Sequence, residues 1–298
     1  MTQSFERAKS RLNNIETIEP LLGALRTISM GAWQKALNDI EKIKRYEENF
    51  SHILLTILPQ IKSPQLRKSK RIIKTPDLAD TIVLIIGTER GLCGKFNENL
   101  AEKSLSWIRE QNFSSYQVWA VGSRMVRILE RMNVEISWRN PIPARDLSNY
   151  PQAYLMTQRW LDQYETYAFN NLVILFNQVA KGSSFDFSTF NLLPYEINHP
   201  LSAGKEKNER WPPPIIETQP KGIYHQIIQH FIASSFLQTL LQSGAAEHSA
   251  RFNLMQEAED NAEEIIEALT RVINNERKRK ITQQMQELAA GAGLLDNK

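Results

Sequence analysis

The first stretch with residue types that could do chemistry is a glycine-containing turn that follows a β-branched run ending at Ile86. It reads Gly87-Thr-Glu-Arg90-Gly91-Leu-Cys93-Gly94-Lys95-Phe96-Asn97. A phosphate-binding loop needs Gly, four residues, Gly-Lys and then Ser or Thr, whose hydroxyl reaches Mg²⁺. Here Phe96 follows Lys95, and only Gly91 and Gly94 fit the dinucleotide pattern Gly-x-Gly-x-x-Gly. We therefore expect these glycines to permit a tight strand-to-helix turn and not to bind a nucleotide.

Other residue types that could support catalysis or metal binding are dispersed. No two of the five histidines have a metal-ligand spacing supported by a cysteine or carboxylate cluster; they are His52, His199, His225, His230 and His248. No local motif indicates a serine nucleophile. The tryptophans are interpreted as packing residues and not as ligand platforms: Trp33, Trp107, Trp119, Trp138, Trp160 and Trp211. We predict no active site, no metal and no cofactor in this chain, and no catalysis by the chain alone.

Two cationic stretches could contact a partner. The first lies in a Pro-containing connection and includes Lys62, Arg67, Lys68 and Arg71, which could bind phosphate or an acidic surface or could simply be solvated. The second, Arg277-Lys-Arg-Lys280, places four cations in just over one helical turn. That arrangement is unfavourable unless acidic groups face it. A scaffold that binds nucleic acid through both stretches is one alternative, and steep salt dependence of DNA affinity would support it.

The second cationic stretch belongs to a very long predicted helix, from Lys221 to Leu295. Apolar or small residues recur in it at steps of three or four, and no proline interrupts it; the series includes Ile223, Ile227, Phe231, Leu237, Leu241, Ala245, Phe252, Met255, Ala262, Ile266, Leu269 and Ile273. Such a stripe is typical of a helix that packs along one seam. An uninterrupted helix of this length would reach roughly 100 Å, so its seam requires a long partner.

The N-terminal segment, from about Ser4 to Ile61, supplies that partner. Its apolar positions recur with a mean step of about 3.5, the spacing of a left-handed coiled coil; they run through Leu12, Ile15, Ile18, Leu22, Leu25, Ile28, Ala36, Ile40, Ile43, Tyr46, Phe50 and Ile57. Pro20 falls inside this pattern, so we expect the helix to kink or restart there. The two ends of the chain are predicted to form an antiparallel intramolecular coiled coil.

Between these helices the pattern changes to alternating strands and helices. Strands are predicted at residues 81–86, 116–121, 134–138 and 171–176, and helices at residues 97–110, 123–132 and 150–167. Edge strands are expected within residues 185–197. Such alternation predicts a three-layer, Rossmann-like α/β domain with right-handed crossovers. The expected organisation is a coiled-coil helix over residues 1–62, the inserted α/β domain with its linkers over 63–215, and a second coiled-coil helix over 216–298.

The bulk composition is that of an ordinary globular protein. The chain has 298 residues, 42% apolar and 23% charged, with a net charge of +3 from 36 basic and 33 acidic residues. This balance does not by itself demand nucleic acid or anionic lipid as a partner. The single Cys93 excludes an intramolecular disulfide. No run reaches 18 apolar residues and no apolar signal core follows Met1, so we expect a cytoplasmic location.

Several motifs together resemble one family, the γ subunit of F-type ATP synthases. The helix residues 243–255, which include Arg251, are similar to its Ser-Glu-x-x-Ala-Arg-Met segment, and Asn275, Arg277 and Ile281-Thr282-Gln283 match its C-terminal signature. The run from Arg90 to Asn97 is similar to its Arg-Gly-Leu-Cys-Gly-x-Phe-Asn motif. The resemblance covers nearly the whole chain. It departs from the family around Pro20, where the apolar phase survives and the polar residues differ.

The resemblance implies a central rotor shaft that couples ion flow through a membrane c-ring to ATP synthesis or hydrolysis. Its implied partners are the α and β subunits, the ε subunit and the c-ring, with one copy per complex and no direct nucleic acid. Contacts with the acidic loop of β and with the apolar bearing of the head would involve Arg251, Arg277, Lys278, Thr282, Leu294 and Leu295. Contacts on the c-ring side would involve Lys62, Arg67, Lys68 and Arg71.

The same resemblance implies a peripheral position at the cytoplasmic face of a plasma or thylakoid membrane, held there through the complex. The departure around Pro20 leaves a second alternative beside the nucleic-acid scaffold. The chain could be a diverged paralogue that serves a second rotary ATPase, or a regulator that binds the ring without coupling.

Overall fold

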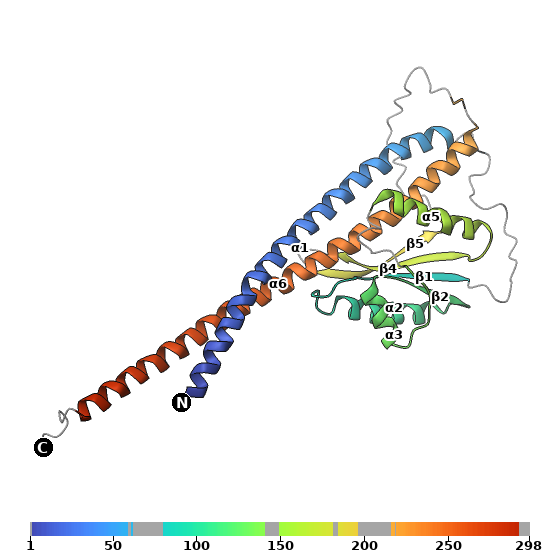
Figure 1. Cartoon of the computed structure of the whole chain (residues 1–298). Coiled ribbons are helices and arrows are strands. Elements are labelled where there is room, and N and C mark those ends of the chain that lie inside the picture. Colours follow the sequence, from blue (N-terminus) through green and yellow to red (C-terminus); the bar gives the residue numbers. More distant parts are fainter. Residues whose placement is uncertain are drawn as a thin grey trace. The chain divides into compact units, whose positions relative to one another are not determined.

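The computed structural model describes residues 2–58, 61, 80–140, 149–180, 184–195, 216–217 and 219–291 (Figure 1). The elements within these residues are α1 (Thr2–Ile57), β1 (Thr81–Ile86), α2 (Phe96–Gln111), β2 (Tyr116–Val121), α3 (Ser123–Arg131), β3 (Ile136–Arg139), α5 (Tyr150–Glu165), β4 (Asn171–Val179), β5 (Phe185–Leu193) and α6 (Pro220–Gly291). The predicted mixed α/β fold with long terminal helices is confirmed. None of the described helices is apolar enough over a sufficient length to cross a membrane.

The chain divides into two compact units. The central unit comprises Gly31–Ala250, and the terminal unit combines Met1–Met30 with Arg251–Lys298. Both long helices contribute one part to each unit. The central unit therefore contains the sheet and one helical pair, and the terminal unit contains a second helical pair.

The sheet of the central unit has five strands in the order β3-β2-β1-β4-β5. Strands β3, β2, β1 and β4 are parallel, and β5 runs antiparallel to β4. All six side chains of β1 are buried, which is typical of a strand covered on both faces. The predicted edge strand after residue 185 is present as β5. The strand predicted at residues 134–138 begins two residues later, at Ile136.

Helices cover both faces of this sheet. Val83 and Ile85 point to the face that packs against α2 and α3, whereas Ile82, Leu84 and Ile86 point to the face that packs against α5 and the long helices. In Figure 1, α2 and α3 lie on the opposite side of the sheet from α5. Full burial of a Leu or Ile side chain contributes about 1.5–3 kcal/mol, so the two apolar layers dominate the stability of this unit.

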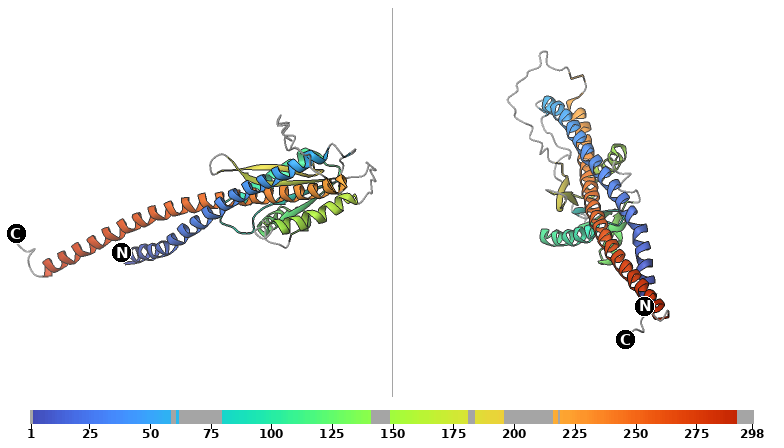
Figure 2. Two further views of the ribbon diagram at one scale, coloured as in Figure 1. Left: turned by 90° about the horizontal axis from the view of Figure 1, so that it is seen from above. Right: turned by 90° about the vertical axis from the view of Figure 1, so that its left-hand side faces the viewer.

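The helical pair of the central unit is antiparallel. Phe50 of α1 lies 6.4 Å, between ring centroids, from Phe231 of α6, and the buried Glu47, three residues earlier, contacts Ser234, three residues later. Residue numbers therefore increase along α1 in the direction in which they decrease along α6. The two views of Figure 2 show these segments of α1 and α6 side by side.

The terminal unit pairs the first part of α1 with the last part of α6. Arg26 Nη1 lies 2.9 Å from Glu259 Oε2, and a Cβ atom added at Gly23 would come within 3.1 Å of Glu259 Oε1. The absence of a side chain at Gly23 therefore leaves room for this carboxylate. Buried side chains in this unit include Ser29, Met255, Ala262 and Ile273.

Of the two expectations for Pro20, the restart of the helix is wrong, because α1 continues through that residue; the kink stays a prediction. Proline leaves the carbonyl oxygen four residues earlier, that of Glu16, without its helical donor. Both residues are exposed, so water can reach this carbonyl group. An exposed position thus lowers the cost of a proline within the helix.

Candidate functional sites

The turn between β1 and α2 is closed by a buried polar network. Thr88 N donates a 2.9 Å hydrogen bond to Asn97 Oδ1, and Asn97 Nδ2 donates a 2.8 Å bond to Thr88 Oγ1. Thr88 Oγ1 in turn donates to the carbonyl oxygen of Arg90 at 2.7 Å. The amide of Thr88 is therefore committed to a hydrogen bond within the protein.

Two glycines near this turn allow close approach of backbone and core. A Cβ atom at Gly87 would lie 2.5 Å from Met125 Cβ. Gly122 has φ of +99°, and a Cβ atom there would lie 2.5 Å from the carbonyl oxygen of Gly87. Gly94 also has a positive φ, +59°, whereas Gly91 has only the Arg124 side chain nearby. The predicted role of Gly94 in a tight turn has a conformational basis.

The run from Arg90 to Asn97 also packs against helix α6. Phe96 is fully buried, packs against Phe185 with a 4.8 Å centroid distance, and shares a small apolar cluster with Cys93, Ala246 and Ala250. Ser243 Oγ donates to the carbonyl oxygen of Ile86 at 3.4 Å. Sequence reasoning placed the motif in a turn but missed this contact; the signal was the pair of alanines four residues apart, Ala246 and Ala250.

The predicted partner-contact cations fall into two environments. Arg251 is only 7% exposed, so its guanidinium is largely enclosed by its own chain. Arg277, Lys278, Arg279 and Lys280 are all exposed. Arg279 Nη1 lies 3.6 Å from Glu276 Oε1. Within the described residues, no carboxylate pairs with the other three cations of this group.

Thr282 is also exposed and uses its hydroxyl locally. Its Oγ1 donates a 3.0 Å hydrogen bond to the carbonyl oxygen of Lys278. The remaining predicted contact residues lie outside the described residues; they are Lys62, Arg67, Lys68, Arg71, Leu294 and Leu295. Their assignment to a c-ring side and to an apolar bearing stays a prediction.

The terminal unit exposes an unusual number of large apolar side chains. On α1, Leu21 is 60% and Ile28 is 66% exposed, and on α6, Met285 is 67% and Leu288 is 73% exposed. Ile28 and the half-exposed Ile18 were predicted to lie in the seam, and that prediction is wrong. Leu21 and Ile28 lie two turns apart on one face of α1, and Met285 and Leu288 lie one turn apart on α6, so each pair forms an apolar stripe that is open to a partner.

An aromatic cluster around His230 ties three helices of the central unit together. Tyr150 of α5 and Tyr46 of α1 both hydrogen-bond to Nδ1 of His230 on α6. The imidazole stacks against Phe50 at 5.3 Å and Tyr154 at 5.2 Å. Burial lowers the pKa of His230 and raises that of Tyr150. Both groups are therefore held in their neutral forms, as a structural clasp requires.

Metal-binding clusters of three or more histidine, cysteine or acidic side chains are absent from the described part of the chain. No catalytic constellation is assembled by the residues above. What they provide is a buried joint between sheet and helix, and a terminal helical pair with an exposed cationic and apolar surface.

Comparison with known proteins gives one consistent result. A family model described as ATP synthase matches residues 4–295. The chain is 24% identical to the ATP synthase gamma chain of Trichlorobacter lovleyi, over 97% of this chain and 98% of that protein. It is 26% identical to the ATP synthase gamma chain of Lactococcus lactis subsp. lactis, over 99% and 100% of the two chains.

Solved structures share the fold. A chain of the rotor of the Euglena gracilis mitochondrial ATP synthase matches with a TM-score of 0.57 at 14% identity, over 94% of this chain and all of that one. A chain from the central stalk and c-ring of the Tetrahymena thermophila mitochondrial ATP synthase matches with a TM-score of 0.52 at 16% identity, over 80% and 99%.

Proposed function

Because the chain belongs to the ATP synthase family, with gamma chains as its relatives over nearly its full length, we propose that it is the central rotor shaft of an F-type ATP synthase. In this role it couples ion flow through a membrane c-ring to ATP synthesis or hydrolysis in a ring of α and β subunits. The chain itself catalyses no reaction. The observation that carries the proposal is the terminal helical pair with its exposed apolar and cationic side chains.

The coupling mechanism is mechanical. A shaft with different side chains around its circumference makes different contacts with β subunits that are otherwise equivalent. Its angle therefore biases which nucleotide site is open or closed, and by linkage the nucleotide state biases the angle. In the terminal unit, exposed Leu21 and Ile28 on one helix and Met285 and Leu288 on the other supply such an uneven surface.

The cations on α6 are assigned to the β subunit. Arg277, Lys278 and Lys280 are exposed and within one helical turn, so they repel one another in the free chain. An acidic loop of the partner would relieve this repulsion and add attraction. Arg251 is a weaker candidate for direct contact with β because only 7% of it is exposed. We assign it a structural role within α6.

The central unit is assigned to the membrane side of the rotor. Its partners are the c-ring and the ε subunit, and the cationic Lys62, Arg67, Lys68 and Arg71 would face the polar loops of the c-ring. One copy per complex is expected. The protein would then be held peripherally at the membrane through the complex, and its affinity for nucleic acid would be weak and non-specific.

The test is assembly with the α and β subunits of the same organism, followed by assay of ATP hydrolysis. The double substitution of Arg277→Gln with Lys278→Gln should lower hydrolysis several-fold without preventing assembly, because it removes charge from the proposed contact with β. Arg271→Gln is the matched control, since Arg271 lies on the same helix and pairs with Glu267 at 3.0 Å within the chain.

The alternatives predict other results. A regulator that does not couple would assemble with the ring, and ATP hydrolysis would then be the same with the double substitution, with Arg271→Gln and with the unmodified chain. A nucleic-acid scaffold would fail to assemble and would bind DNA with steep salt dependence that the double substitution reduces. Either result would overturn the rotor assignment.

A further inference from the structure

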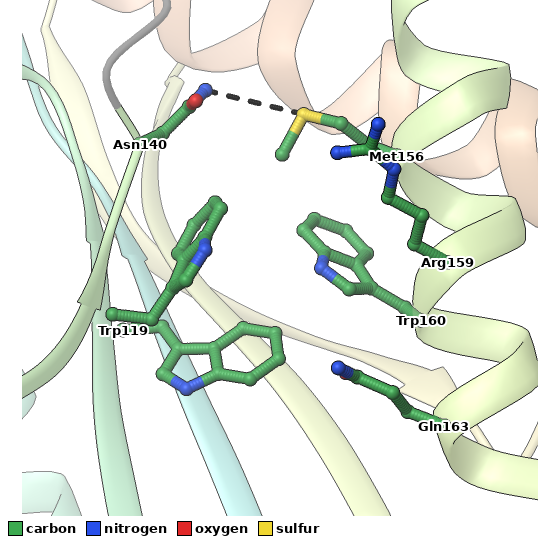
Figure 3. A pocket seen from close by; sticks show the side chains of 7 residues that line it. Trp119, Asn140, Met156, Arg159, Trp160 and Gln163 are labelled. Atoms are coloured by element: carbon green, nitrogen blue, oxygen red, sulfur yellow. Dashed lines mark hydrogen bonds between the residues drawn. The ribbon is translucent and has the colours of Figure 1, made fainter.

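A pocket of about 440 Å³ lies within the central unit, between the edge of the sheet and helix α5 (Figure 3). Three tryptophans and a methionine form its apolar wall, and three polar side chains complete it; the lining residues are Trp119, Trp138, Asn140, Met156, Arg159, Trp160 and Gln163. Neither the rotor role nor the joint at Phe96 uses this pocket.

Strand register and helix spacing bring the tryptophans together. Trp119 of β2 and Trp138 of β3 are direct neighbours across parallel strands, so both side chains project from the same face of the sheet. On α5, Met156, Trp160 and Gln163 recur at steps of four and three, which places them on one side of that helix. Centroid distances among the three indole rings are 5.2, 5.9 and 6.1 Å.

Of the three indoles, Trp138 has the most surface facing the open volume of the pocket. Trp119 is 7% and Trp160 is 4% exposed to solvent, and Trp138 is half-buried. Pockets that bind small molecules have volumes of about 300–1,000 Å³ and mostly apolar or aromatic walls with a few polar groups. The tryptophan pocket meets both criteria.

A cation stands at the mouth of the pocket. Arg159 is exposed on α5, and no carboxylate of the described residues forms an ion pair with it. Asn140 Nδ2 lies 3.9 Å from Met156 Sδ, and Figure 3 shows Asn140 and Arg159 on the same side of the opening as Met156, with Gln163 farther along α5. The wall therefore favours a flat aromatic group, and the rim favours a negatively charged or hydrogen-bond-accepting substituent.

We propose that this pocket binds an aromatic molecule of two or three rings that carries an anionic group. The rings lie against the exposed part of the Trp138 indole, which packs on Trp119 and Trp160, and the anion lies beside Arg159. Trp160 also packs edge-on against Phe236 of α6, at 4.8 Å and 73°. A molecule in the pocket thus touches a side chain that bears directly on the long helix, although binding itself does not depend on the rotor role.

The probe for the test is 8-anilinonaphthalene-1-sulfonate, with N-phenyl-1-naphthylamine as the uncharged counterpart that lacks the sulfonate. Both are titrated into the full chain, and binding is followed by energy transfer from tryptophan to the probe. We expect saturable binding of both. Arg159→Gln should weaken the sulfonate about fivefold and leave the uncharged probe unchanged. Arg127→Gln, on the exposed surface of α3, is the matched control.

A second pair of variants tests the aromatic wall. Trp138→Leu should weaken both probes about tenfold, whereas Trp107→Leu, in the apolar layer on the opposite face of the sheet, should leave both affinities unchanged. Should Trp138→Leu fail to fold, Gln163→Trp fills the exposed rim with a bulky ring and should abolish binding. Absence of saturable binding to the unmodified chain would overturn the proposal. The proposal would also be overturned if the Gln163→Trp chain bound the two probes as tightly as the unmodified chain does.

Discussion

Ser234 on α6 donates a 2.6 Å hydrogen bond to Oε1 of Glu47 on α1. Glu47 is only 6% exposed and Ser234 only 1%, so a carboxylate is enclosed in the helical pair of the central unit. A buried carboxylate is costly unless hydrogen-bond donors face it. The contact also fixes the alignment of the two helices, because a shift of either helix would remove the donor from the carboxylate.

Ser234→Ala should therefore lower the free energy of unfolding by about 1–3 kcal/mol, the cost of removing a hydrogen bond from a buried charged group. Thermal or chemical denaturation of the full chain measures this value. Ser51→Ala is the control, because the Ser51 hydroxyl donates only to the backbone oxygen of Glu47 within α1 and its loss should cost less. Equal effects of the two substitutions would contradict the importance of the inter-helix bond.

Asn97→Ala should destabilise the central unit more than any exposed substitution on α2. It removes both hydrogen bonds to Thr88 and leaves the amide of Thr88 buried without its acceptor, a loss of about 2–3 kcal/mol. Asn99→Ala, two residues on and exposed, should be neutral or slightly stabilising because alanine favours a helix. Denaturation curves for the two variants compare them directly.

Gly87→Ala should prevent normal folding, since its Cβ atom would lie 2.5 Å from Met125 Cβ, far inside contact distance. Gly31→Ala provides the contrast. It lies within α1 with no atom within 4 Å of an added Cβ, so the change should stabilise the chain by about 0.4–1 kcal/mol. Soluble yield and melting temperature report both outcomes. A Gly87→Ala chain that melts at the unmodified temperature would show that the turn is looser than described.

Acidification should weaken the clasp around His230. Its pKa is lowered by burial in the folded chain, so the unfolded chain binds the proton more readily. Stability from this group is present above the unfolded pKa of about 6.5 and falls as the pH drops below it towards the folded value. A protonated imidazole carries N–H on both ring nitrogens, so Nδ1 could then only donate to Tyr150.

In His230→Gln, the melting temperature should fall less between pH 7.5 and pH 5 than it does in the unmodified chain. His52→Gln, an exposed substitution on α1, should leave the loss in place. A pH dependence that persists unchanged in His230→Gln would assign it to other groups.

The regular elements were predictable because local patterns determine them. The six apolar residues of β1 require burial on both faces, and the spacing from Ile40 to Ile57 requires a helical partner; both expectations agree with the structure. The exposure of Ile28 was not predictable, since a period of about 3.5 identifies an apolar face without saying whether the same chain or another protein covers it.

The tertiary features were missed for a different reason. The contact of Phe96 with Ala246 and Ala250 joins residues about 150 positions apart, and the tryptophan pocket depends on strand register and on the rotation of α5. A local pattern encodes neither the strand register nor the rotation of α5, and the alanine pair on α6 does not by itself identify Phe96 as its partner. The tryptophans were interpreted as packing residues; Trp119, Trp138 and Trp160 do pack against one another, and they also line the pocket.

The most direct test of the rotor assignment is to watch the chain turn. The full chain is assembled with α and β subunits of the same organism, the head is fixed to a surface through β, and a bead is attached through Glu102→Cys, an exposed position on α2; the native Cys93 is buried and should not react. A rotor predicts that ATP drives rotation in one direction, with a dwell for each β subunit. ATP hydrolysis by an assembled head whose bead only fluctuates about one angle would contradict it.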